Sequence, residues 1–226
     1  MNKKIILIAI VVIGLAVFGA YEYLTRPPLA PTVNVSDVAD KSVSDNKDMA
    51  DQKVYKIDQS KSKVEFGINE VLRGSQFVAR GTTNQIGGDI LLSSEGLNFS
   101  EISINARTFK TDDSKRDGAI NRMILKTSDP KNELITFLPD SVSGAPYKIT
   151  GNEFDLDVKG LLTISQVSKE IIFPLHINID QDSVTGSGQL RIKRSDFDLK
   201  IPNLSFIASV DDEFPIYADF VATLVK

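Results

Sequence analysis

The sequence predicts an all-β fold, an antiparallel β-barrel of about eight strands with one inserted short helix. From residue 53 onward, apolar and polar residues alternate with a period of two in segment after segment, and short turns separate the segments. Such alternation is typical of strands with one buried face. Apolar residues recur at clear helical spacing between residues 112 and 130. A β-sandwich is the alternative, but a barrel is favoured because closure removes the sheet edges.

The longest alternating stretch runs from Glu153 to Asp180 and predicts a hairpin. Its pattern is interrupted by a polar break at residues 165–168 and then restarts. The residues expected on its apolar face are Phe154, Leu156, Val158, Gly160, Leu162, Ile164, Ile171, Phe173, Leu175, Ile177 and Ile179. Because successive side chains of a strand point to opposite faces, this hairpin has one apolar face that must be covered.

Shorter alternating stretches predict the remaining strands. They are residues 63–69, 86–92, 97–108, 134–138, 187–193, 204–210 and 216–224. Residues 71–84 have a mixed pattern that includes Gly74 and Gly81, and we predict a connection there rather than a strand.

The single predicted helix follows Asp112 and Asp113 and ends before Pro130. Its apolar residues are Ala119, Ile120, Met123 and Ile124. This spacing gives the helix one core-facing side. Asp112, Asp113 and Asp117 are interpreted as favourable charges near the helix N-terminus, since their spacing lacks the glycine and the terminal glutamate of a calcium-binding EF-hand loop.

Residues 1–24 predict a transmembrane anchor. Lys3 and Lys4 precede sixteen uncharged residues, 5–20, and Tyr21 and Tyr23 suit the far membrane interface. The two lysines predict a cytoplasmic N-terminus, so that the rest of the chain lies outside the cytoplasm. A cleaved signal peptide is the alternative interpretation, and the protein would then be secreted.

Residues 25–52 predict a disordered linker. Pro27, Pro28 and Pro31 are followed by a mixture of small, charged and polar residues without an aromatic side chain. Such a segment buries too little apolar surface to offset the conformational entropy of ordering it. The barrel domain is therefore assigned to residues 53–226.

Composition excludes several classes of function. The chain of 226 residues has no cysteine and one histidine, so disulfides, thiolate metal sites and cysteine nucleophiles are excluded and a multi-histidine metal site is not expected. A net charge of -4 argues against a nucleic-acid partner. No G-x-S-x-G motif occurs, and His176 is expected on the exposed face of its strand without a catalytic partner. We expect no enzymatic activity, no metal and no cofactor.

Several short motifs, in order, resemble the YceI-like family. Lys159-Gly160-Leu161-Leu162-Thr163-Ile164-Ser165-Gln166-Val167-Ser168-Lys169 resembles the family's hairpin pattern G-x-LTI-x-G-V-T-K. Arg116-Asp117-Gly118 is similar to its RD step, and Arg194-Ser195-Asp196-Phe197 resembles its R-x-D-F-G step. Tyr55-Lys56-Ile57-Asp58 with Ser62-Lys63-Val64-Glu65-Phe66 looks like its opening. The resemblance spans about residues 54–226.

The resemblance implies a lipocalin-like barrel that is exported in bacteria, has no catalytic activity and holds an isoprenoid or related lipid in its interior. With the predicted anchor, it implies a single-pass protein of the bacterial inner membrane whose barrel domain is extracytoplasmic, in the periplasm. This chain departs from the family pattern at Gln166 and Asp198, where the family has glycine. Asp tolerates left-handed backbone geometry better than Gln does.

The apolar strand faces predict an interior that suits a long lipid chain, because burial contributes about 0.8 kcal/mol per methylene. The candidate ligand-binding residues are Phe66, Ile68, Ile104, Phe137, Phe154, Leu156, Leu162, Phe173, Leu175, Phe206 and Phe220. The alternative is that these side chains pack on one another. The protein would then be a packed barrel that acts in protein interaction or envelope stress, with Leu161 and Ile172 as outward apolar candidates.

Arg116 is a candidate contact for a polar lipid head group, since its guanidinium suits a phosphate. The alternative is that Arg116 and Asp117 stabilise the helix start and tie it to Arg194 or Asp196. The sequence leaves the lipid, the oligomeric state and the protein partners open.

Overall fold

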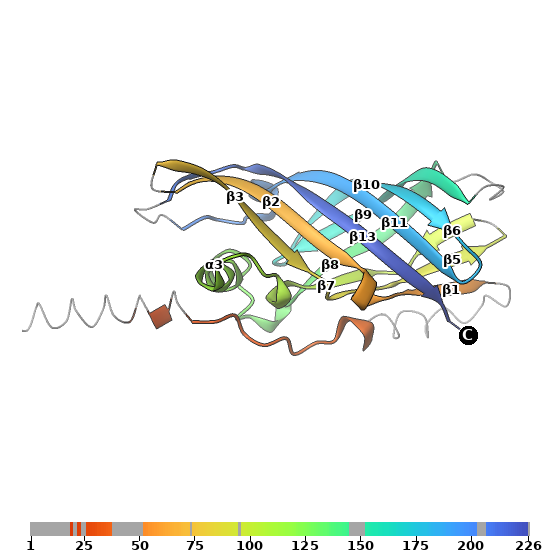
Figure 1. Ribbon diagram of the computed structural model, residues 1–226, viewed down its shortest axis with the longest axis horizontal. Coiled ribbons are helices and arrows are strands. Elements are labelled where there is room, and N and C mark those ends of the chain that lie inside the picture. Colours follow the sequence, from red (N-terminus) through yellow and green to blue (C-terminus); the bar gives the residue numbers. More distant parts are fainter. Residues whose placement is uncertain are drawn as a thin grey trace, which may run out of the picture.

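The computed structural model describes residues 19, 22–23, 26–37, 52–72, 74–94, 96–144, 152–202 and 207–225. Figure 1 shows a strongly curled antiparallel sheet with α3 at one end of it. The strands are β1 Lys53–Ile57, β2 Lys63–Leu72, β3 Ser75–Thr83, β4 Ile86–Gly87, β5 Asp89–Ser93, β6 Gly96–Phe99, β7 Ile102–Asn105, β8 Leu134–Ser143, β9 Glu153–Ile164, β10 Val167–Ile179, β11 Ser183–Lys193, β12 Ile207–Val210 and β13 Glu213–Leu224. The helical turns are η1 Gln59–Lys61, η2 Ala106–Thr108, α3 Ser114–Ala119, η3 Ile120–Ile124, η4 Pro130–Asn132 and η5 Arg194–Phe197.

The sheet curls so far that β4 and β5, which lie at and next to the opposite ends of its pairing order, are consecutive strands in the sequence. Hydrogen-bonded neighbours follow the order β4-β7-β8-β9-β10-β11-β13-β1-β5-β6, and β2 joins β13, β3 and β12. Only Gly88 separates β4 from β5, so the path returns to the segment from which it started. The predicted all-β antiparallel fold is confirmed. The described residues form 13 strands rather than about eight, because bends such as the one at Gly88 divide long extended stretches.

The predicted hairpin forms as β9 and β10. Ile164 pairs with Val167, so Ser165 and Gln166 are the two turn residues. Their φ angles of 48° and 66° are both positive, as a two-residue type I′ turn requires. Leu156, Val158, Leu175 and Ile177 are buried, whereas Asp155 and Asp157 are exposed. The face assignment of the hairpin is therefore confirmed.

Residues 71–84 differ from the predicted connection, because they complete β2 and form β3. The buried inward side chains of β3 are small, namely Ala79, Gly81 and Thr83, and Phe77 belongs to the same series but is exposed near the start of the strand. A Cβ atom at Gly81 would lie 2.3 Å from the ring of Phe66. The buried part of the inner face of β3 therefore carries small side chains, because the large Phe66 ring of β2 already covers it.

The predicted helix is confirmed as α3, which continues into a π-helical turn, η3. Asp113 is the N-cap, and its carboxylate accepts a hydrogen bond from the Lys115 amide. The Asp117 carboxylate accepts hydrogen bonds from the backbone N–H and the hydroxyl of Thr111. These contacts fit the interpretation of the acidic cluster as helix-start charges.

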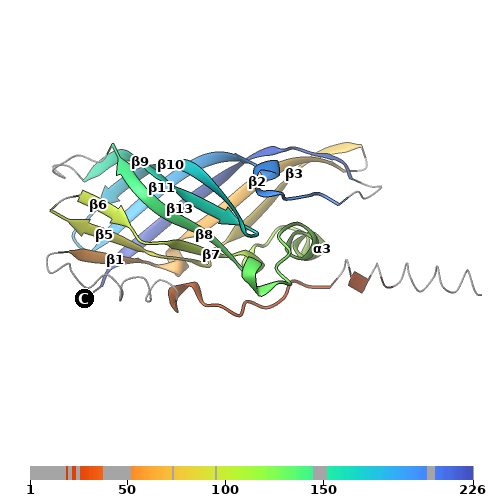
Figure 2. The same cartoon turned by 180° about the vertical axis from the view of Figure 1, so that it is seen from behind.

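Residues 26–37, which we call the strap, differ from the disordered linker that the sequence predicts. Figures 1 and 2 show this segment running along the domain from α3 towards η1. The Arg122 side chain donates a hydrogen bond to the Pro27 carbonyl at the start of the strap, and Gln59 donates one to Ser36 near its end. Val35 is fully buried. Prolines and small residues can follow a surface closely, so low hydrophobicity did not prevent ordered packing.

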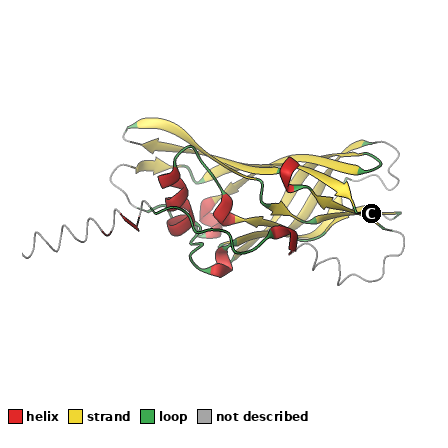
Figure 3. Cartoon of the chain, turned by 60° about the horizontal axis from the view of Figure 1, so that its bottom comes forward, coloured by secondary structure: helices red, strands yellow, loops and turns green. Residues whose placement is uncertain are grey.

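The predicted anchor, residues 1–24, lies outside the described residues except for Gly19, Glu22 and Tyr23. Phe206 also lies outside them, and so do residues 38–51 of the predicted linker. Within the part of the chain that the structure describes, no helix is both long enough and apolar enough to span a bilayer. Figure 3 shows that strands build most of the domain and that the helices are short.

Candidate functional site

The curled sheet encloses an apolar cavity of about 280 Å³. Most of its wall comes from the inward side chains of the strands, and α3, η3 and the chain after η5 complete one end. A single water needs roughly 10–15 Å³ of such space, so the interior is far from solidly packed. The volume lies near the lower limit of typical small-ligand pockets.

Most of the sequence-predicted interior residues line this cavity. They are Phe66, Ile68, Ile104, Phe137, Leu162, Phe173, Leu175 and Phe220. Leu156 is instead buried in the surrounding core at 3% exposure, and Phe154 packs against that core. Residues that the sequence reasoning missed also contribute, notably Ile120 and Ile124 of the helical turns and Ile201 after η5. The period of two could not identify these residues, because they lie outside strands.

Glycines on the inner face explain how a wall rich in phenylalanine leaves a cavity. Phe220 lies over Gly186, its direct partner across β11 and β13. A Cβ atom at Gly186 would lie 2.2 Å from that ring. A Cβ atom at Gly81 would lie 2.3 Å from the Phe66 ring, one at Gly188 would lie 2.6 Å from the Phe173 ring, and one at Gly160 would lie 2.8 Å from the Phe137 ring. Each ring therefore lies against the wall above a glycine instead of filling the interior.

A few charged side chains occur at the end of the cavity next to α3. Glu70 follows Phe66 and Ile68 on the inner face of β2, and its carboxylate lies 3.1 Å from the Arg116 guanidinium. The side chains of Glu70 and Arg116 are 11% and 20% exposed, so this end reaches solvent. Arg194 lines the same cavity and lies 3.7 Å from Asp212. We call Glu70, Arg116 and Arg194 the charged rim.

The structure corrects one expectation for the helix start. Arg116 and Asp117 are not tied to Arg194 or Asp196, because Arg116 pairs with Glu70 and with Asp112 on its own helix start. The sequence contained a signal for the Glu70 contact that we did not use. Glu70 is the one acidic residue in the inward series of β2, and a carboxylate on an apolar face needs a partner.

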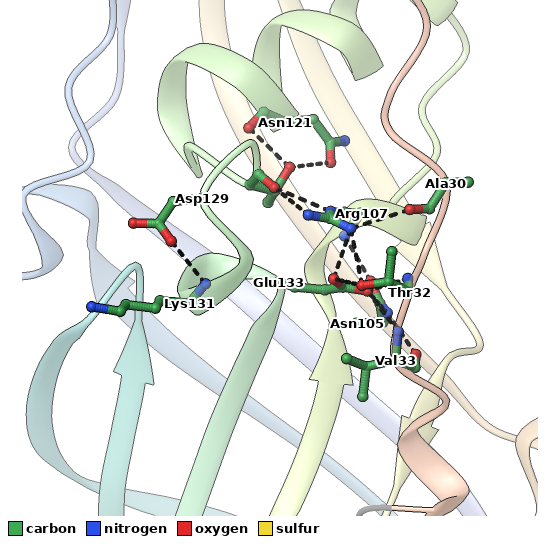
Figure 4. Close-up of polar contacts among 10 residues, drawn as sticks. Ala30, Thr32, Val33, Asn105, Arg107, Asn121, Asp129, Lys131 and Glu133 are labelled. Atoms are coloured by element: carbon green, nitrogen blue, oxygen red, sulfur yellow. Dashed lines mark hydrogen bonds and ion pairs between the residues drawn. The ribbon is translucent and has the colours of Figure 1, made fainter.

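A second buried region is polar and lies beneath the strap (Figure 4). The Arg107 guanidinium lies 2.7 Å from the Glu133 carboxylate, and the two side chains are 4% and 1% exposed. Asn105 donates to Glu133, and so do the backbone N–H groups of Thr32 and Val33 and the Thr32 hydroxyl. We call Asn105, Arg107 and Glu133 the buried polar node.

The polar node joins the strap to the helical end of the domain. Arg107 donates to the carbonyls of Ala30 in the strap and of Thr127 after η3. Burial by itself would raise the pKa of Glu133, but the hydrogen bonds from Thr32, Val33 and Asn105 outweigh it and hold this pKa below its ordinary value. The carboxylate therefore remains ionised and paired at neutral pH.

The described residues offer little for catalysis. His176 is exposed, as the sequence predicts, and its Nδ1 lies 2.8 Å from an exposed Asp155 carboxylate on the outer face of the hairpin. No group of three or more histidine, aspartate and glutamate residues in the described ranges is placed to hold a metal ion. The apolar cavity and the charged rim are taken as the candidate binding site.

The family model for the YceI-like domain matches residues 55–222. Among solved structures, Burkholderia cenocepacia BcnA is 22% identical and aligns with a TM-score of 0.58 over 74% of this chain and 99% of that one. A polyisoprenoid-binding domain from Saccharophagus degradans, implicated in plant cell wall breakdown, is 16% identical and has a TM-score of 0.58, with coverage of 76% and 98%. These two likenesses show the fold. A comparison with curated protein sequences gave no match.

Proposed function

Since the chain belongs to the YceI-like domain family, we propose that it is a non-catalytic binding protein that sequesters or carries a long isoprenoid-type lipid inside its curled sheet. The observation that carries this proposal is the apolar cavity of about 280 Å³. The polyisoprenoid-binding domain of Saccharophagus degradans, which has the same fold, supports the choice of ligand class.

The physical basis of the proposed binding is burial of the lipid chain. Each methylene transferred from water contributes about 0.8 kcal/mol, and the sum over an isoprenoid chain is large compared with one hydrogen bond. The wall that would contact the lipid chain carries aromatic rings over glycines, such as Phe220 over Gly186. An apolar wall does not distinguish sharply between lipid chains of different structure, so we expect the affinity to depend on the length of the lipid chain.

A packed interaction module is the second candidate function, and one observation favours it. Leu138, Leu161 and Ile172 are 51%, 42% and 54% exposed, respectively, on the outer face of β8, β9 and β10. Leu138 pairs directly with Leu161, so these side chains form a small apolar patch. An interaction module without a ligand would have an interior filled by its own side chains, however. The cavity therefore makes lipid binding the better proposal.

We further propose that residues 1–24 anchor the protein in the bacterial inner membrane, with the domain in the periplasm. The support is the run of sixteen uncharged residues after Lys3 and Lys4. The strap begins at residue 26, shortly after the proposed anchor ends at residue 24. An anchor there would hold the α3 end of the domain near the bilayer. Membrane fractionation with protease protection of the full chain tests this placement, and recovery of the mature protein without residues 1–24 would contradict it.

A length series of prenyl alcohols tests the binding proposal. We expect the affinity of the full chain, measured by equilibrium dialysis, to rise by up to about fourfold per added methylene until the cavity is filled. Ala218 lines the cavity, so Ala218→Phe should remove the response to the longer alcohols. Thr185→Phe adds a comparable ring on the outer face of β11 and is the matched control. Equal binding by both variants would refute the cavity as the binding site.

A further inference from the structure

We propose that the turn end of the β2–β3 hairpin docks on the lipid surface of the membrane and sets the orientation of the domain there. We call this surface the hairpin tip and define it by the described residues Leu72, Gly74 and Ser75–Val78. The inference rests on the proposed membrane anchor, residues 1–24, and goes beyond it, because an anchor alone does not fix which side of the domain faces the bilayer. It does not depend on what the cavity binds.

The chain between the proposed anchor and the strap is attached to the helical end of the domain. The Arg122 guanidinium lies 5.6 Å from the centre of the Tyr23 ring. A Cβ atom at Gly118 would lie 2.5 Å from the Arg26 carbonyl, so the backbone at the start of the strap lies directly against α3. A tyrosine at the end of an anchor lies at the membrane interface. With residues 1–24 inserted, the membrane surface is therefore next to α3 and η3.

The hairpin tip projects from this same end of the domain. Glu70 lies level with α3, because its carboxylate is 3.1 Å from the Arg116 guanidinium. Strand β2 then continues to Leu72 before the turn, and each residue adds about 3.3 Å to its length. Figures 1 and 2 accordingly show the β2–β3 turn extending past α3, at the end of the domain where the strap begins. A bilayer next to α3 therefore meets the hairpin tip.

The side chains of the hairpin tip suit a lipid surface. Phe77 and Val78 are 48% and 51% exposed, and as neighbours in β3 they point to opposite faces of the sheet, so the tip is apolar on both sides. Residues 71–79 include one arginine and no acidic residue, although the whole chain has a net charge of -4. Aromatic and apolar side chains bind at the bilayer interface, and a segment without carboxylates is not repelled by anionic phospholipids.

A tryptophan introduced at the tip tests the inference, because the chain itself contains none. The full-length variant Phe77→Trp is reconstituted into vesicles of equal parts phosphatidylethanolamine and phosphatidylglycerol, and flotation after a carbonate wash measures its insertion. We expect the tryptophan emission to shift to shorter wavelength and to be quenched about twofold by phospholipids with brominated acyl chains. Val78→Trp is a second reporter with the same expected response, in case Phe77→Trp does not fold.

Two exposed apolar positions outside the tip provide matched controls. Ile172 on the outer face of β10 and Val225 after β13 are 54% and 55% exposed, close to the values for the tip. Val225 is next to the C-terminus, which Figure 1 places at the end of the domain opposite α3. We expect the emission of Ile172→Trp and of Val225→Trp to be unchanged by the brominated lipids.

Quenching of Phe77→Trp and Val78→Trp no greater than that of Val225→Trp would overturn the inference, and so would stronger quenching of Ile172→Trp. In both cases the anchor proposal stands, because flotation reports it separately. An emission shift that grows with protein concentration in detergent, without vesicles, would identify a second copy of the chain as the occupant and would also overturn the inference. If the wild-type chain does not float with the vesicles, the anchor and the inference fail together, and the lipid-binding proposal is unaffected.

Discussion

The cavity and the buried polar node both lie inside the domain, yet they are built in opposite ways. The cavity has an apolar wall whose rings lie over glycines, and space remains inside it. The node has a buried ion pair whose hydrogen bonds to the strap and to neighbouring turns leave little unsatisfied. An apolar wall tolerates unfilled space better than a buried charge tolerates a missing partner. We therefore assign binding to the first region and stability to the second.

The largest effect that separates the two regions should come from Arg107→Ala. Removing the guanidinium leaves Glu133 buried and charged, and breaking such pairs costs about 3–5 kcal/mol. We expect this loss in the free energy of unfolding from urea denaturation, whereas the affinity of the remaining folded protein for geranylgeraniol should hardly change. Arg191→Ala, which breaks an exposed ion pair with Glu213, should cost less than about 1 kcal/mol. A cost for Arg107→Ala as small as that for Arg191→Ala would contradict the assigned role of the node.

Gly186→Ala should have the converse effect, because it disturbs the cavity wall. The new Cβ atom would lie 2.2 Å from the Phe220 ring, and the ring must then turn into the cavity. We expect the affinity for geranylgeraniol to fall by about tenfold. Thr185→Ala, at an outward position of the same strand, should leave it unchanged. If Gly186→Ala binds as the wild type does, the rings over glycines do not shape the binding space.

Part of the pH dependence of stability should come from the node. The pKa of Glu133 is lower in the folded chain than its ordinary value of 4.5. On acidification the unfolded chain therefore takes up this proton first, so the stabilising contribution is complete above pH 4.5 and is lost as pH falls through the folded-state pKa. Melting temperatures measured across this range should fall less steeply for Glu133→Gln than for the wild type. Glu213→Gln, at an exposed position, should follow the wild-type slope.

The smallest effect is expected at the hairpin turn, where neither region is touched. Gln166 has a φ of 66°, which costs free energy, but its side chain donates a 2.9 Å hydrogen bond to Asn132. Gln166→Gly loses the bond and relieves the strain, so it should change the free energy of unfolding by less than about 0.5 kcal/mol. Gln166→Ala loses the bond and keeps the strain, and should cost about 1 kcal/mol. Equal losses in both variants would show that the turn is unstrained.

Much of the fold could be predicted from the sequence because strand periodicity is a local property. The hairpin of β9 and β10, its inward face and the helix at α3 follow from short-range patterns alone. The strand β3 was missed because its buried inward residues are small, and that smallness makes sense only once the Phe66 ring is placed over Gly81. Contacts between distant residues decide such positions.

The candidate site was only partly predictable for the same reason. Inward aromatic residues could be listed from the strand pattern, but the wall formed by Ile120, Ile124 and Ile201 depends on how helical turns and a loop close one end. The strap was missed because its partner, Glu133, lies about one hundred residues further along the chain, as the separation of 101 positions from Thr32 shows. A proline-rich sequence can be ordered by partners that it does not itself contain.

The amount of lipid that copurifies with the full chain tests the central claim most directly. The protein is purified from several bacterial hosts, extracted with organic solvent, and the extract is quantified by mass spectrometry against protein. The Ala218→Phe variant is the control. It has the same N-terminal segment as the wild type, so the lipid that it retains measures the lipid bound to that segment. We predict close to one isoprenoid-type lipid per wild-type chain in excess over this variant. Equal lipid in the two proteins across all hosts would contradict the claim that the cavity is a lipid-binding site.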